Sequence, residues 1–158
     1  AGGMDIAEYI RRRSEPASER HACMALLGLN TPTFDAVWKA VAVGLSVGVL
    51  DRFTANSGIK ENRITDVLRL TGESLAARRR TGRLTSDESD RMVTVAHFYG
   101  LALDLFAGDP ALATAWLQSR QPSLEGAVPL DLARTMVGAR EVDATLGRLV
   151  IGSGKYPR

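Results

Sequence analysis

The sequence is poor in cysteine and has no long apolar run. Its single cysteine, Cys23, excludes an internal disulfide and a structural zinc site built from cysteines. No run reaches the roughly eighteen apolar residues that a membrane-spanning helix needs, and no stretch resembles a signal peptide. These absences predict a reduced, cytoplasmic protein that has no membrane partner.

Aromatic residues and strand-like alternation are also scarce. Aromatic residues make up 6% of the 158-residue chain, so we expect a core built mainly from Leu, Val and Ala. No segment alternates apolar and polar residues over the length of a strand, whereas helix start and stop signals are frequent. The sequence therefore predicts an all-α fold. We interpret residues 1–3 as a tag remnant, residues 4–84 as an N-terminal region and residues 85–158 as a C-terminal domain.

Capping signals divide the chain into short helices. Thr85 and Glu88 fit a capping box, which places the neighbouring acidic residues at a helix N-terminus, where negative charge is favourable. Asp109 followed by Pro110 starts the next helix. The expected helices are Ile6–Arg13, Glu19–Leu27, Thr33–Val43 with Thr31 or Thr33 as cap, Val47–Ala55, Lys60–Leu68, Gly72–Arg80, Thr85–Ala107, Pro110–Leu117, a short one starting at Pro129, and Ala139–Leu149.

Charge is arranged in blocks along the chain. Residues 60–84 carry seven basic and three acidic residues, residues 85–147 carry four basic and nine acidic ones, and the last eleven carry three basic and no acidic ones. A basic surface concentrates anions and an acidic one repels them, so the blocks indicate two different partners. The alternative for the arginine run at 78–83 is the solvated surface of a helix.

Residues 47–84 have the spacing of a helix-turn-helix unit. Its second helix would bury Ile64, Val67 and Leu68, and Arg69 occupies a turn position that often carries Gly for positive φ. The third helix of such a unit lies in the DNA major groove. Arginines at its C-terminal end would bind phosphates, and Glu73 would accept a hydrogen bond from a cytosine amine. The candidate DNA-binding residues are Thr71, Glu73, Ser74, Arg78, Arg79, Arg80 and Arg83.

The C-terminal half carries many motifs in one order. Residues 122–152 read PSLEGAVPLDLARTMVGAREVDATLGRLVIG, and RRRTGRLTSDESDR and LALDLFAGDPALATAWL precede them. In these segments the chain resembles the Xre/MbcA/ParS family of toxin-binding antitoxins, specifically the Xre-like antitoxins paired with RES-domain toxins. The resemblance spans about Leu45 to Gly152.

The resemblance implies both a fold and a role. The implied fold is a Cro-repressor-like helix-turn-helix region followed by a helical toxin-binding domain. The implied role is to bind a RES toxin, an enzyme that consumes NAD⁺, and to cover its active site. Such antitoxins form homodimers within a larger complex with the toxin, and the complex often represses its own operon by binding operator DNA.

The chain ends in a short, cationic segment with glycine joints. A cleft that binds a dinucleotide pyrophosphate should offer positive charge and amide donors, which the terminal carboxylate would satisfy, while Tyr156 would stack in place of a base. Arg148 and Lys155 would pair with acidic residues of the toxin. The alternative is a frayed terminus. The candidate toxin-binding residues are Leu146, Arg148, Leu149, Ile151, Gly152, Lys155, Tyr156 and Arg158.

No residue pattern indicates catalysis, a metal site or a cofactor. Besides His21 and Cys23 the sequence holds no second cysteine and only one further histidine, His97, which is far away in the chain. We therefore expect His21 and Cys23 to be a surface and a core residue of a helix, and His97 to be structural. Asp104 and Asp109 fall on a helix end and a cap, which argues against a pair of catalytic carboxylates.

The two tryptophans, Trp38 and Trp116, are expected to anchor the helical cores, with an interface role as the alternative. The sequence thus predicts a non-enzymatic antitoxin. The alternative is a free-standing helix-turn-helix transcriptional regulator that has no toxin partner.

Overall fold

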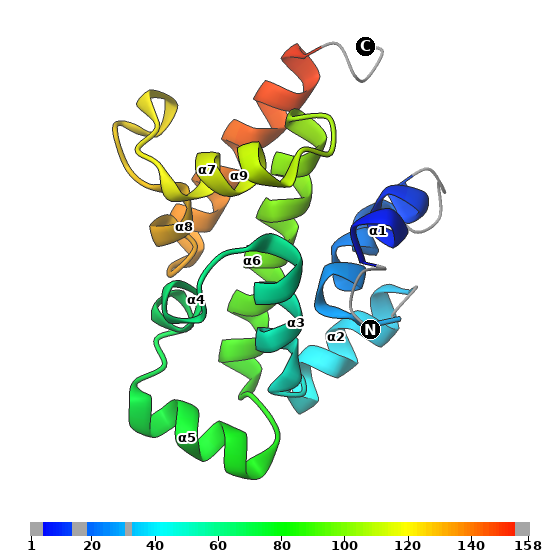
Figure 1. Cartoon of the computed structure of the whole chain (residues 1–158), viewed down its shortest axis with the longest axis vertical. Coiled ribbons are helices and arrows are strands. Elements are labelled where there is room, and N and C mark those ends of the chain that lie inside the picture. The colour runs from blue at the N-terminus through cyan, green and yellow to red at the C-terminus, as the bar shows by residue number, and fades with distance from the viewer. Residues whose placement is uncertain (1–4, 14–18, 31–32, 154–158) are drawn as a thin grey trace.

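The fold is built from helices. The computed structural model describes residues 5–13, 19–30 and 33–153, and over these it holds nine α-helices, two 3₁₀ helices and no sheet (Figure 1), which confirms the predicted fold class. Within the same residues no helix is long and apolar enough to cross a membrane. The elements are α1 (Asp5–Arg13), η1 (Glu19–Leu27), α2 (Phe34–Val43), α3 (Gly48–Ser57), α4 (Glu61–Val67), α5 (Gly72–Thr81), α6 (Ser86–Leu105), α7 (Pro110–Gln118), η2 (Pro122–Leu124), α8 (Pro129–Leu132) and α9 (Met136–Gly152).

Several helices begin at the caps that the sequence predicts. The hydroxyls of Thr33, Thr71 and Thr85 each accept a hydrogen bond from an amide of the following helical turn, and the capping box at Thr85 is complete. The carboxylate of Asp109 caps α7 in the same way. Arg69, in the link between α4 and α5, has a φ of 59°, the left-handed conformation that its turn position predicts. Local side-chain chemistry therefore decides where these helices start.

Three expectations about the helices are wrong. Residues 19–27 form a 3₁₀ helix rather than an α-helix; residues 22–27 are all buried, so they offer no periodic pattern from which helix type could be judged. The last helix is longer than Ala139–Leu149, because Thr135 caps it and accepts a hydrogen bond from the Gly138 amide at 3.1 Å. Trp38 is 48% exposed and anchors no core, whereas Trp116 packs half-buried against it.

Helix α6 is the centre of the molecule. It contacts η1 and α2 on one side and α7 and α9 on the other (Figure 1). Its buried residues include the predicted stripe of Met92, Val95, Tyr99 and Leu103, and the Tyr99 ring meets the ring of Phe53 edge-on, with centroids 5.7 Å apart. The apolar core is continuous across Thr85, where the sequence suggests a division.

The N-terminal helices are docked on α6 through a buried tyrosine. The Tyr9 hydroxyl donates to the Gly100 carbonyl oxygen at 2.7 Å and lies 3.0 Å from a carboxylate oxygen of Asp104. The hydroxyl of Ser89 accepts a hydrogen bond from the Leu45 amide at 2.8 Å and ties the end of the same region to the start of α6. One function of the segment before Leu45 is therefore to cover α6.

Candidate functional site

Helix α5 carries five of the seven candidate DNA-binding residues, between its cap Thr71 and the following Arg83, and lies at the lower edge of the molecule (Figure 1). The Thr71 hydroxyl accepts from the Ser74 amide at 3.1 Å and lies 2.9 Å from the Ser74 hydroxyl, so both side chains contribute to the helix cap. Glu73 is exposed in the first turn. No residue of α5 is buried, and Leu75 is only half-buried against the core. Polar contacts must therefore supply much of what holds α5 in place.

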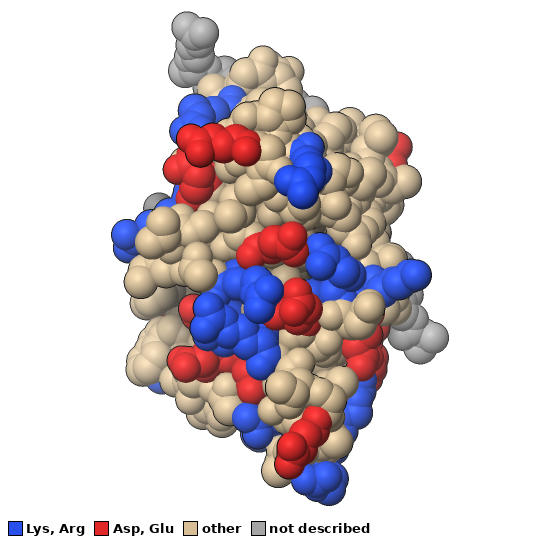
Figure 2. Space-filling model, turned by 90° about the vertical axis from the view of Figure 1, so that its left-hand side faces the viewer, with Lys and Arg blue, Asp and Glu red and all other residues tan. Residues whose placement is uncertain are grey.

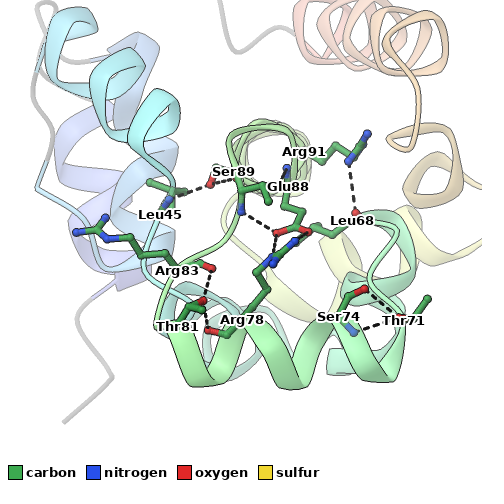
Figure 3. A network of polar contacts seen from close by, with 11 residues as sticks. Leu45, Leu68, Thr71, Ser74, Arg78, Thr81, Arg83, Glu88, Ser89 and Arg91 are labelled. Atoms are coloured by element: carbon green, nitrogen blue, oxygen red, sulfur yellow. Dashed lines mark hydrogen bonds and ion pairs between the residues drawn. The ribbon is translucent and has the colours of Figure 1, made fainter.

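Arg78 is ion-paired with Glu88 at the start of α6. Its Nε and Nη2 atoms donate to the two carboxylate oxygens at 2.8 and 3.1 Å (Figure 3). Glu88 also accepts from the Thr85 amide at 2.8 Å and is almost fully buried. Burial alone would raise the pKa of Glu88, but the hydrogen bonds from Arg78 and Thr85 and the charge of Arg78 outweigh it, so the pKa lies below its ordinary value.

Arg79 joins α5 to the two preceding helices. Its guanidinium donates to both carboxylate oxygens of Asp51 on α3 at 3.1 and 3.0 Å, and to Glu61 on α4 at 2.8 Å. The pKa of Arg79 is raised above its ordinary value, mainly because its guanidinium donates hydrogen bonds to Asp51. The three helices α3, α4 and α5 are thus linked by one side chain.

Arg80 and Arg83 differ in whether their side chains have hydrogen-bond partners in the described part of the chain. The Arg83 guanidinium donates to the Gly44 carbonyl oxygen at 2.8 Å, and the backbone beside it pairs with Ser46. Arg80 is exposed and makes no hydrogen bond or ion pair with any residue that the structure describes. Of the four arginines predicted to bind phosphates, three therefore have partners within the chain.

The face around α4, α5 and α8 carries both signs of charge. Figure 2 shows Lys and Arg atoms interleaved there with Asp and Glu atoms, and no large area of one sign. Two cross-links on this side join α4 to the segment around α8: Arg63 pairs with Asp131 at 3.0 Å, and Arg134 pairs with Asp66 at 3.5 Å. The sequence did not reveal these pairs, because their partners lie 68 residues apart.

A Glu88→Gln variant is expected to be less stable than the parent protein at neutral pH, by an amount that shrinks as the pH falls. Because the pKa of Glu88 is lowered in the folded protein, its contribution is complete above the ordinary value of 4.5 and is lost as the pH falls through the folded value. Urea unfolding at neutral pH and in steps to about pH 2.5 measures this. The control is Asp87→Asn, one residue earlier and exposed; a difference for Glu88→Gln that stayed constant across the range would contradict the assignment.

Helix α9 has one face in the core and one outside it. Val142, Leu146 and Val150 follow one another at intervals of four and are buried, together with Thr145. Leu146 was a candidate toxin-binding residue; its side chain is fully buried, so it positions α9 and is closed to a partner.

The other described candidates lie at exposed positions of the last two turns. Ile151 is 57% exposed, Leu149 is more than one-third exposed, and Gly152 ends the helix. Arg148 is exposed, and its guanidinium lies 3.9 Å from the Glu141 carboxylate and 3.1 Å from the Thr145 hydroxyl. Lys155, Tyr156 and Arg158 lie outside the described residues. The last turns of α9 thus expose one arginine and, on either side of the buried Val150, two apolar side chains.

A groove of about 680 Å³ runs beside the first turns of α6 and α9. His97 on α6 hydrogen bonds across it to Asp143 on α9 at 2.7 Å, which gives this histidine a structural role. Met136 lies at the groove and Val137 is beside it, both largely exposed. The groove is formed by segments that are far apart in the sequence, so no local sequence motif could predict it. Its charged lining residues are Arg69, Asp87, Asp90, Arg91, Arg134, Arg140 and Asp143.

No catalytic or metal-binding constellation is found in the described part of the chain. No group of three or more His, Cys, Asp or Glu side chains is placed there to hold a metal ion. Cys23 is buried, and desolvation raises the pKa of its thiol to about 11. A thiol with that pKa stays protonated at neutral pH and is a poor nucleophile.

Comparison with known proteins finds antitoxins, both among protein families and among individual relatives. Residues 101–150, from the last five residues of α6 through most of α9, match the family described as "Antitoxin Xre/MbcA/ParS C-terminal toxin-binding domain". The chain is 30% identical over 138 residues to a protein named Antitoxin Xre from Yersinia enterocolitica, covering 87% of this chain and 93% of the relative. It is 29% identical over 113 residues to an Antitoxin Xre from Photorhabdus laumondii, covering 69% of this chain and 74% of that one.

Proposed function

Because this chain belongs to the Xre/MbcA/ParS family of antitoxins, we propose that it neutralises a RES-domain toxin by covering the NAD⁺ site of that enzyme. The chain is an Xre-type antitoxin with a C-terminal toxin-binding domain, and proteins of this family act by binding rather than by catalysis. The proposal adds the identity of the toxin and the part of the antitoxin that enters its cleft.

The end of α9 carries this proposal. Leu149 and Ile151 expose apolar surface on either side of the buried Val150, and the exposed Arg148 lies one turn before Ile151. Arginine is enriched in binding hot spots, and the exposed apolar side chains of the same turns offer surface that a partner can remove from water. The chain continues from there into the glycine-jointed cationic segment, so helix end and tail together form the proposed toxin-binding element.

An Ile151→Asp variant tests this element. A charge placed at the centre of an apolar contact should weaken toxin binding by about 30-fold or more, while an exposed position leaves the fold intact. Co-expression of the neighbouring toxin gene with each variant, while growth and cellular NAD⁺ are followed, gives the readout. The matched control is Val137→Asp, the same change at an exposed site at the other end of α9, which should neutralise the toxin normally.

Removal of Ser153–Arg158 separates the helix from the tail. If the shortened chain still neutralises the toxin, the tail is not the plug and the surface around Arg148 is the principal contact. If Ile151→Asp also neutralises the toxin normally, this end of the domain is not the binding site.

We also propose that α3, α4 and α5 form a DNA-binding helix-turn-helix unit in a homodimer that regulates its own operon. The link with Arg69 at positive φ supports this role, as does the exposed Arg80, which has no polar partner among the described residues. Since most neighbouring arginines are ion-paired within the chain, few phosphate contacts and a shallow salt dependence are expected.

Titration of operator DNA at several salt concentrations, with and without toxin, tests the proposed DNA binding. Strong, salt-dependent binding by the lone protein, together with failure to co-purify with the neighbouring gene product, would favour the free-standing regulator instead.

A further inference from the structure

The groove beside the first turns of α6 and α9 gathers four arginines from segments that lie far apart in the sequence. Arg69 comes from the link between α4 and α5, Arg91 from α6, Arg134 from the link between α8 and α9, and Arg140 from α9. The groove volume of about 680 Å³ is in the range of pockets that bind small molecules. Neither the proposed toxin contact at the end of α9 nor the proposed DNA contact on α5 uses this groove.

The groove arginines are not held by carboxylates at short range. Arg91 donates to the Leu68 carbonyl oxygen at 3.4 Å (Figure 3), and Arg134 lies 3.5 Å from a carboxylate on α4. The guanidinium groups of Arg69 and Arg140 have no polar partner among the residues that the structure describes. By contrast, the paired arginines of α5 meet carboxylates at 2.8 Å. The groove thus holds the arginine side chains of this region that are least satisfied within the chain.

Arg69 occupies a strained backbone position. Its φ of 59° lies in the left-handed region, which a glycine adopts without strain and a residue with a Cβ atom does not. Residues held in such conformations cluster at functional sites. Its strained backbone, its exposed side chain and its lack of a polar partner in the described chain together indicate that Arg69 binds a group from outside the chain.

Bonds between the elements that form the groove hold its walls in place. His97 on α6 bonds to Asp143 on α9 at 2.7 Å, and Arg134 connects the start of α9 to Asp66 on α4. A preformed site loses little conformational freedom when a ligand binds. A ligand would therefore meet guanidinium groups that the fold has already assembled.

We propose that the groove binds a nucleoside phosphate, with its phosphate groups at Arg69 and Arg140. The planar guanidinium donates two parallel hydrogen bonds to phosphate oxygens, which makes arginine well suited to this anion. Arg91 and Arg134 add positive charge and further donors from the same groove. Only their contacts of 3.4 and 3.5 Å would have to be exchanged for bonds to the ligand.

The other lining residues favour a nucleoside phosphate over a bare anion. The exposed carboxylates of Asp87 and Asp90 on α6 have no polar partner in the described part of the chain, and they repel an anion placed close to them. They accept hydrogen bonds from neutral donors, such as the hydroxyl groups of a sugar or the amino group of a base. The apolar lining, which a base would cover, consists of Val93, Phe98, Ala133, Met136 and Ala139.

The test is isothermal titration calorimetry of the full chain with four nucleoside diphosphates, which carry adenine, guanine, cytosine or uracil. At about 0.15 M salt, where weak surface attraction is screened, at least one of them should bind saturably with a dissociation constant below about 1 mM. The matching nucleoside and inorganic phosphate should each bind at least about tenfold more weakly, because each lacks one part of the contacts.

Two groove variants and a control locate the binding. Arg140→Gln should weaken nucleotide binding about tenfold or more, because charge-assisted hydrogen bonds to phosphate are lost. Arg69→Gly should weaken it to a similar extent and yet melt no lower than the parent, since glycine adopts the positive φ without strain. The matched control is Arg120→Gln, the same change as at 140 but at an exposed arginine outside the groove, which should bind nucleotide like the parent.

Three results would overturn the proposal. One is the absence of saturable binding for all four nucleotides. Another is binding that the two groove variants leave unchanged, or that Arg120→Gln weakens equally, which marks a response to net charge. The third is inorganic phosphate that binds as tightly as the nucleotide, which would make the groove a site for a bare anion. Ile151→Asp, at the far end of α9, should bind nucleotide like the parent, so this proposal and the toxin-binding proposal can fail independently.

Discussion

A Gly138→Ala variant is expected to lose about 2–4 kcal/mol of unfolding free energy and to bind toxin more weakly than the parent protein. A Cβ atom at position 138 would lie 2.3 Å from the carbonyl oxygen of Leu132 and 3.0 Å from its carbonyl carbon and Cα. These are backbone atoms where α8 runs into α9, and they cannot rotate away as a side chain can. The whole of α9 must therefore move away from α8, and the proposed toxin contacts at Leu149 and Ile151 move with it.

Gly147 is the matched control for this change. It lies in the interior of the same helix, and an added Cβ there meets no atom within 4 Å. Gly147→Ala should therefore gain about 0.5–1 kcal/mol from the better helix propensity of alanine. In a protein of this length, 1 kcal/mol corresponds to roughly 2–4 °C in Tm, so thermal unfolding resolves the two variants easily. Equal melting temperatures for Gly138→Ala and the parent would show that the α8–α9 crossing is looser than the structure indicates.

The sequence predicted best those features that depend on residues close together in the chain. The caps at Thr71, Thr85 and Asp109 and the positive φ of Arg69 follow from local backbone and side-chain chemistry, and the structure confirms each of them. The buried stripe of α6 was predictable for the same reason, because a period of 3.6 residues is visible within one helix. Trp38 shows the limit: a tryptophan in an apolar helix predicts burial, but only the tertiary arrangement decides which side of α2 meets the core.

The candidate site was less predictable, because its contacts are long-range. The run of arginines suggested phosphate binding, yet Arg79 finds its carboxylates 18 and 28 residues earlier, on α4 and α3. Glu88 was expected to act only as a helix cap, and the structure adds the ion pair with Arg78 ten residues before it. A signal existed in that case, since a basic residue and an acidic one flank a tight turn at Gly82. Composition alone could not tell a partner in DNA from a partner in the same chain.

Helix α6 fixes the positions of the N-terminal helices, α5 and α9 relative to one another, because each of them is bonded to it. The N-terminal helices reach it through Tyr9, α5 through the Arg78–Glu88 pair, and α9 through the His97–Asp143 hydrogen bond. A shift of α6 would therefore be transmitted to all three elements. Toxin binding at α9 and DNA binding at α5, both proposed here, would share this helix as their physical connection.

A Gly44→Ala variant is expected to lose about 3 kcal/mol or more of unfolding free energy. Gly44 ends α2 with a φ of 99°, a conformation that L-residues with a Cβ atom rarely adopt, and an added Cβ would lie 2.2 Å from the Leu84 carbonyl oxygen. Around this point the chain before α3 crosses the chain after α5: the Leu84 amide donates to the Leu45 carbonyl oxygen at 2.9 Å and the Val47 amide to the Gly82 carbonyl oxygen at 3.0 Å. Forcing these two segments apart should break both hydrogen bonds and release the C-terminal end of α5.

The matched control for Gly44 lies four residues further on. Gly48 begins α3, and a Cβ there makes only an ordinary contact at 3.5 Å with the Ser46 hydroxyl, so Gly48→Ala should leave the stability unchanged or raise it slightly. Hydrogen exchange separates local from global effects: in Gly44→Ala the amides of Val47 and Leu84 should lose more protection than those of α9. Because no residue of α5 is buried, the backbone pairing of the segment that follows it should act together with the ion pairs of Arg78 and Arg79 to keep the helix in place. Normal protection at Val47 and Leu84 in a stable Gly44→Ala protein would show that α5 is held by its ion pairs alone.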